Sequence, residues 1–165
     1  MMATGFARWG FPKESFGVGF AIGLLLAGGL ATGSPDVRAD PRVRLTITVI
    51  HAKKTPPFLH ERLKPMWETL RRTFGDRFAH YNLLSTTEKE VTKGDRVEAP
   101  TPEGGQFAVT YRGVSEDGRF VKLDIQQGAL SSRVRLHNGG LVFQAGKRHE
   151  GGVLVVGVQA AVVKP

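Results

Sequence analysis

Apolar and polar side chains alternate at the start of the patterned part of this chain. Over residues 42–51 every second position from Val43 to Val49 is apolar, and the positions between them hold arginine and threonine. A period of two is typical of a strand with one face in the core and the other toward solvent. Pro56 and Pro57 follow, and proline cannot donate a hydrogen bond within a sheet. The pattern predicts a first strand over 42–51 that ends before these prolines.

The segment after the prolines has the spacing of an amphipathic helix. Because a turn contains about 3.6 residues, apolar side chains three or four positions apart form one stripe, and the glycine at position 75 is a helix stop. Pro65 removes a backbone hydrogen bond, so we expect a short helical turn over 57–63 and a main helix that begins near Pro65. We expect Trp67 to be buried. The apolar stripe consists of Leu59, Leu63, Met66, Trp67, Leu70 and Phe74.

Strands separated by turns follow the helix. Residues 106–114 and 119–126 flank an Asp-Gly pair, the strongest short hairpin signal. A further hairpin is expected to join 131–136 with 141–145 through an Asn-Gly-Gly turn. Residues 153–163 are apolar almost throughout, which predicts a central strand buried on both faces. The remaining expectations are one long or bulged strand over 81–93, a turn over 93–95, a short return strand over 96–99 and a loop over 100–105.

These elements place the fold in the α+β class. They amount to one strand, one amphipathic helix and a mostly antiparallel sheet of six to seven further strands. A doubly wound sheet would need a helix between each pair of strands, whereas the strands here follow one another through short turns.

The first 39 residues have the order of an export signal: a basic segment, an apolar run and a polar segment. The uncharged run over 16–30 is shorter than the roughly 20 apolar residues that span a bilayer. Small side chains stand at Ala39 and two positions before it, where a signal peptidase inspects the chain. We therefore expect a signal peptide over 1–39, cleaved after Ala39, and a single domain over 40–165. Cleavage after Ala31, an uncleaved membrane anchor and a start codon placed too early are the alternatives.

Charge and cysteine content narrow the partners and the compartment. The whole chain carries a formal charge of +8, and the part after Ala39 keeps 20 bases against 13 acids. Such an excess favours anionic partners, although it bears on solubility and association more than on fold. The chain has no cysteine, which excludes disulfides, thiolate metal sites, thiol nucleophiles and a lipidated cysteine. An exported domain without disulfides is more typical of bacterial envelopes than of small secreted domains of higher organisms.

The candidate binding residues are basic. If they share one face of the protein, they form an electrostatic patch for a polyanion or a protein partner. The alternative is a solvated helix face with no binding role. No aromatic residue alternates with these bases as a platform for stacked nucleotides, so nucleic acid is not an expected partner. The predicted patch consists of Arg62, Lys64, Arg71, Arg72, Lys147 and Arg148, and Lys53 and Lys54 precede the helix.

The sequence contains no recognisable catalytic, cofactor or metal motif. His60 and Glu61 would begin a zinc-protease motif, but Lys64 stands where the second histidine is required. No serine lies in the Gly-x-Ser-x-Gly sequence of a nucleophile elbow. Each glycine pair of the predicted domain precedes a strand, whereas a phosphate loop leads into a helix. We therefore expect no cofactor, no metal and no enzymatic activity. The five histidines are dispersed: His51, His60, His80, His137 and His149.

Three hypotheses about function follow from these patterns. The first is an exported, non-enzymatic interaction or assembly module that docks on another envelope protein, in the bacterial periplasm or outside the cell, as an accessory of a secretion or motility machine. The second is a basic polyanion-binding protein that acts through the helix face. The third is a small hydrolase whose loop-assembled site uses His51, His80 and His137. Residues 136–146 are similar to the strand, glycine-turn, strand hairpins of envelope-secretion proteins, a resemblance that assigns no role to any residue.

Overall fold

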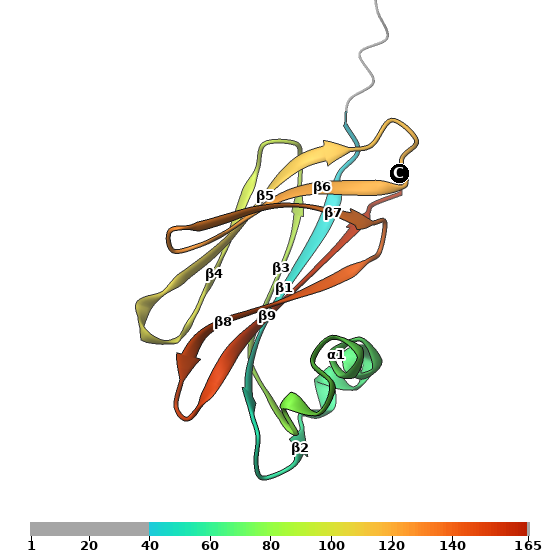
Figure 1. Ribbon diagram of the computed structural model, residues 1–165. Coiled ribbons are helices and arrows are strands. Elements are labelled where there is room, and N and C mark those ends of the chain that lie inside the picture. Colours follow the sequence, from blue (N-terminus) through green and yellow to red (C-terminus); the bar gives the residue numbers. More distant parts are fainter. Residues whose placement is uncertain (1–39, 165) are drawn as a thin grey trace, which may run out of the picture. The chain divides into compact units, whose positions relative to one another are not determined.

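The computed structural model describes residues 40–164, except for the side chain of Glu103 (Figure 1). The predicted signal peptide over 1–39 lies outside the described residues. Residues 40–164 form nine strands, one α-helix and three 3₁₀ helices. In chain order these are β1 (Val43–Lys53), β2 (Phe58–Leu59), η1 (Glu61–Met66), α1 (Trp67–Phe74), η2 (Gly75–Arg77), β3 (His80–Val91), β4 (Arg96–Pro100), η3 (Pro102–Gly104), β5 (Gln106–Val114), β6 (Phe120–Gln127), β7 (Leu130–His137), β8 (Leu141–His149) and β9 (Gly152–Val162).

The strands form two sheets. The first has the order β2-β3-β1-β9-β8, and the second has the order β4-β5-β6-β7. All strand pairs of the described residues are antiparallel except the two-residue β2, which runs parallel to β3. The α+β class is confirmed. The expected single sheet is wrong, because eight strands follow β1 and are divided between two sheets.

The larger core cluster joins side chains of both sheets. β1 contributes its alternating apolar residues from Val43 to Val49, and the second sheet contributes Phe107 and others. β9 lies between β1 and β8. Its Val156 belongs to this cluster, while the neighbouring Val155 is buried on the opposite face. The predicted central strand is therefore confirmed, and its continuous apolar sequence reflects cover on both faces.

A smaller core cluster lies beneath the helical segment, on the other face of the first sheet (Figure 1). It joins Leu63 and Leu70 to Ile50 of β1 and Tyr81 of β3. On the same face of β1, Arg44 is exposed near the start of the strand, whereas Ile50 is buried. The helical segment covers only the later part of this face. The alternating pattern of β1 therefore gives way to consecutive buried residues there.

The predicted helix is present with shifted bounds. Pro65 lies inside η1, and α1 begins at Trp67, two residues after the proline. Gly75 ends the helix with a φ of 54°, a left-handed conformation that glycine adopts at little cost. Leu63 and Leu70 are fully buried, but Trp67 is only partly buried. The expectation for Trp67 is thus corrected, because the two leucines occupy the innermost positions of the stripe.

Two predicted strand features are confirmed. β5 and β6 pair as antiparallel neighbours across the Asp-Gly turn, where Gly118 has a φ of 69°. β3 is one long strand, and its register with β1 shifts by one residue between Val49 and Ile50. Such a shift is the mark of a β-bulge.

The expected hairpin between 131–136 and 141–145 is wrong. Both strands exist as β7 and β8, but β7 pairs with β6 and β8 pairs with β9, so they belong to different sheets. The N–H of Gly139 in the connection donates to the carbonyl of Ala160 in β9 (2.8 Å). The glycine turn therefore carries the chain from one sheet to the other. In the same way, β4 leaves β3 after the predicted turn and pairs with β5.

Candidate functional site

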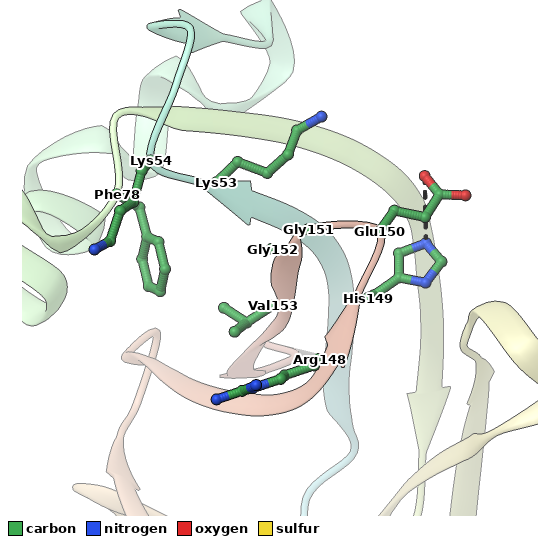
Figure 2. A pocket seen from close by; sticks show the side chains of 9 residues that line it. All are labelled: Lys53, Lys54, Phe78, Arg148, His149, Glu150, Gly151, Gly152 and Val153. Atoms are coloured by element: carbon green, nitrogen blue, oxygen red, sulfur yellow. Dashed lines mark ion pairs between the residues drawn. The ribbon is translucent and has the colours of Figure 1, made fainter.

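A pocket of about 450 Å³ lies at the end of the first sheet where β1 ends and β9 begins (Figure 2). Three segments of the chain meet there: the end of β1, the segment just before β3 that contains Phe78, and the turn between β8 and β9. We call it the basic pocket. Its lining residues are Lys53, Lys54, Phe78, Arg148, His149, Glu150, Gly151, Gly152 and Val153.

Strand pairing brings these segments together. β1 and β9 are antiparallel, with Ala52 opposite Val153, so the end of β1 lies beside the start of β9. The N–H of Ala79 donates to the carbonyl of Lys53 (3.0 Å). That bond holds the preceding Phe78 at the same end of the sheet.

The turn between β8 and β9 forms one wall of the pocket with bare backbone. Glu150 and Gly151 have positive φ values of 40° and 74°, the combination that tight hairpin turns use. A Cβ at Gly152 would lie 2.3 Å from the carbonyl oxygen of Ala52. Glycine at this position therefore permits the close approach of β9 to β1.

An aromatic ring and an aliphatic side chain give the basic pocket an apolar part. Figure 2 shows Phe78 and Val153 on facing sides of the hollow, with Arg148 running along its lower side. The ring of Phe78 meets those of Phe74 and Tyr81 edge-on, at centroid distances of 5.8 and 6.3 Å. Phe78 and Val153 also pack against the smaller core cluster. The core therefore holds this apolar wall in place.

Cations outnumber acids in the basic pocket. Lys53, Lys54 and Arg148 carry positive charge at neutral pH, and Glu150 is the one acid among the described residues that line the pocket. Nε2 of His149 lies 3.9 Å from a carboxylate oxygen of Glu150 (Figure 2). The side chains of Lys54 and Arg148 are exposed. An anion that enters the pocket would therefore meet an excess of positive charge.

His51 contacts the pocket lining through His149. It is 4% exposed, and its Nε2 lies 2.9 Å from the carbonyl oxygen of His149, so this ring nitrogen carries the hydrogen and donates it. The two imidazole rings meet edge-on with centroids 5.1 Å apart. Burial lowers the pKa of His51, and the charge of Lys53 acts in the same direction. A neutral His51 therefore anchors the end of β8 beside the turn.

The structure divides the predicted basic patch. Arg148 lines the basic pocket, together with Lys53 and Lys54 from the segment before the helix. Lys147 lines a different pocket, next to the irregular register of β8. The remaining four residues lie on η1 and α1 with exposed side chains, and Lys64 pairs with Glu61 (2.8 Å). These four are Arg62, Lys64, Arg71 and Arg72.

Sequence reasoning missed the apolar half of the pocket and its glycine wall. The predicted strand over 153–163 includes Val153 and follows the glycine pair at 151 and 152, but no sequence pattern assigns Phe78 to an element or brings it to these residues. No short sequence pattern marks this site, because the residues meet only through the pairing of the first and last strands, which is a tertiary feature. Had that pairing been assumed, the end of the first strand, with Lys53, would have been placed against the glycine turn.

The three histidines of the hydrolase hypothesis each have a contact of their own. The Nε2 of His51 bonds to the carbonyl of His149, and the Nδ1 of His80 lies 2.9 Å from the carbonyl oxygen of Pro56. The ring of His137 lies against that of Phe120, with centroids 4.4 Å apart and the ring planes tilted by 39°. Within residues 40–164 no three histidine or acidic side chains are grouped so that they could hold a metal ion.

No protein-family model, no curated protein and no solved structure matches this chain. Of the helices in the described part of the chain, none has the length and apolar character needed to cross a membrane.

Proposed function

We propose that the chain is an exported, non-enzymatic docking module that binds an anionic group of an envelope partner in the basic pocket. One observation supports this most directly: Lys53 and Lys54 at the end of β1 and Arg148 of β8, far apart in the sequence, line the same pocket. Ionised donors form shorter and stronger hydrogen bonds to carboxylates and phosphates than neutral donors do. Their convergence therefore favours the capture of an anion.

The chemistry of the lining favours binding over covalent catalysis. His149 and Glu150 could exchange a proton, but the lining contains no serine, threonine or cysteine that they could activate as a nucleophile. Lys54 and Arg148 line the pocket together with the apolar side chains of Phe78 and Val153, and a ligand packed against these apolar groups would displace water from beside the cations. Electrostatic attraction to an anion strengthens where water is excluded.

The export part of the proposal rests on the leader sequence. A basic segment, an apolar run and small residues before position 40 favour delivery to the periplasm or the exterior of a bacterial cell. In that compartment the partner would be another envelope protein, and a secretion or motility machine would be a fitting assembly.

The proposal is tested by capture of the partner from envelope extracts. The domain over 40–165 is immobilised beside a Lys54→Glu, Arg148→Glu variant and a Arg62→Glu, Arg71→Glu variant, in which the net charge changes equally. We expect crosslinking to a protein partner for the unaltered domain and the helix variant, and loss of that partner for the pocket variant. A domain that captures no partner, or a pocket variant that captures it as well as the helix variant, would overturn the proposal.

A second candidate function is the binding of a polyanion along the helical segment. The exposure of Arg62, Arg71 and Arg72 favours it. Counterion release predicts that retention on a heparin column would fall steeply with salt. Here the Arg62→Glu, Arg71→Glu variant should lose retention and the pocket variant should keep it. Elution of the unaltered domain with a neutral protein of equal size would exclude this candidate.

A further inference from the structure

We infer that the ligand of the basic pocket is an anion joined to an apolar body, such as a carboxylate or phosphate attached to an aromatic ring or a short hydrocarbon. This inference rests on the proposed function, because it names the chemistry of the group that the pocket would capture. It separates that group from a bare inorganic anion and from a uniformly charged polymer.

The size of the basic pocket is the first ground. Its volume of about 450 Å³ falls in the range of roughly 300–1,000 Å³ that is typical of sites for organic ligands. An inorganic phosphate bound to one cation would leave most of this space to water. A ligand with a body of several carbon atoms would fill it.

The apolar wall is the second ground. Phe78 and Val153 are partly buried, pack on the smaller core cluster and still line the pocket. Apolar surface of a ligand placed between them would leave water, and this transfer is favourable in proportion to the area removed. A polymer with charge on every unit has no such surface to place there.

The position of the charges is the third ground. Lys54 and Arg148 come from different segments and lie at the margin of the hollow, near the apolar pair (Figure 2). Within the described residues, neither Lys54 nor Arg148 forms an ion pair. An anionic group at the mouth could therefore meet a cation while the body of the ligand lies inward.

The glycine turn is the fourth ground. A Cβ at Gly151 would meet no atom within 4 Å, so the space beside this part of the backbone is open. Glycine lets a ligand approach the main chain closely because no side chain intervenes. A flat ring could thus pack against the turn as well as against Phe78.

Such a group has two sources, a free small molecule or the end of a protein partner that carries an apolar last side chain. Both present an anion next to an apolar body. The chemistry of the pocket is the same for the two, and the experiment separates them.

The experiment is a titration of the isotope-labelled domain, followed by NMR, with three matched probes. Phenyl phosphate carries both features, inorganic phosphate only the charge, and benzyl alcohol only the apolar ring. We expect phenyl phosphate to bind about tenfold or more tightly than either of the others, with shifts centred on Phe78, Arg148 and Val153. The Lys54→Glu, Arg148→Glu variant should lose about the same factor, and the Arg62→Glu, Arg71→Glu variant should bind as the unaltered domain does.

A second pair of probes identifies the source. A tripeptide that ends in phenylalanine with a free carboxylate is compared with its amide. Binding of the acid but not of the amide supports capture of a partner's chain end, and binding of phenyl phosphate alone supports a free small molecule.

Failure of the inference differs from failure of the proposed function. Inorganic phosphate that binds as tightly as phenyl phosphate would overturn the inference and leave the docking proposal intact. If no probe binds but the pocket variant still loses the envelope partner, the inference is likewise overturned and the docking proposal stands. If no probe binds and the pocket variant captures the envelope partner as well as the unaltered domain does, the inference and the docking proposal are both overturned.

Discussion

The indole of Trp67 meets the ring of Tyr81 edge-on, with centroids 5.8 Å apart and an interplanar angle of 74°. Trp67 is the first residue of α1 and Tyr81 is a fully buried residue of β3. Edge-on aromatic pairs are favourable because the positive edge of one ring faces the negative face of the other. This contact therefore fixes the start of the helix on the first sheet.

Truncation of Trp67 tests that role. Because the side chain is only partly buried, we expect Trp67→Ala to lower the free energy of unfolding by about 2–3 kcal/mol, less than the roughly 3–5 kcal/mol of a fully buried tryptophan. Urea denaturation followed by circular dichroism measures the loss. Arg72→Gln on the exposed side of the same helix should stay within about 0.5 kcal/mol of the unaltered domain. Equal losses in the two variants would show that the aromatic contact contributes nothing.

The adjacent residues Gly151 and Gly152 are required for different reasons, and substitutions at each position distinguish these two reasons. Gly151 has a left-handed φ of 74° with open space around it, whereas Gly152 is confined by the carbonyl of Ala52. Asparagine tolerates left-handed backbone better than alanine does. We expect Gly151→Asn to be less destabilising than Gly151→Ala. At Gly152 the order should reverse, because any larger side chain adds to the clash.

Thermal denaturation of the four glycine variants gives this order directly. If the order of the asparagine and alanine variants in melting temperature is the same at both positions, the steric explanation for Gly152 is wrong.

Burial of His51 makes part of the stability dependent on pH. The lowered pKa means that the folded chain keeps this imidazole neutral where the unfolded chain, with an ordinary value of 6.5, takes up a proton. The contribution is therefore complete above pH 6.5 and is lost as the pH falls below it toward the lowered value. Melting temperature between neutral and mildly acidic pH should fall more steeply for the unaltered domain than for His51→Gln. Parallel curves would contradict this assignment.

Both tyrosines of the chain should resist ionisation in the folded protein. Burial raises the pKa of Tyr81, and burial with the charge of Asp40 raises that of Tyr111 to about 12. The hydroxyl of Tyr111 donates to the carbonyl of Pro41 (2.9 Å). Because the folded state disfavours the tyrosinate, stability is complete below pH 10 and declines as the pH rises from 10 toward 12.

Tyrosinate absorbance during an alkaline titration measures this resistance. The signal should rise only well above pH 10 or together with unfolding, and Tyr111→Phe should remove the later-titrating component. A full tyrosinate signal near pH 10 in a chain that is still folded would be inconsistent with buried hydroxyls.

Features that depend on neighbouring residues were predictable from the sequence. The Asp-Gly turn at Gly118 joins the two strands that flank it, and Gly75 ends the helix at the expected position. That β7 and β8 pair with other strands and not with each other was not predictable from the glycines between them. The same glycine turn can close a hairpin or lead into another sheet, and the contact of Gly139 with Ala160 of β9 decides between these outcomes.

The candidate site was predictable only in part. The sequence indicated that basic residues such as Lys54 and Arg148 are numerous enough to bind an anion. It did not indicate which of them converge, and it placed Arg148 in one patch with Arg71 of the helix. Phe78 carried no signal at all, because its position beside Val153 depends on the pairing of β1 with β9.

By itself the sequence determined the α+β class, the amphipathic helix, the central character of the last strand and the positive charge of the domain. These features follow from periodicity and turn chemistry, which depend on residues close together in the sequence, and from composition, which does not depend on residue order. Only the tertiary structure decided that the strands divide into two sheets and that β1 ends beside the start of β9. Strand partners are selected by how buried side chains pack across the whole domain. The basic pocket lies where that packing brings the end of β1 beside the start of β9.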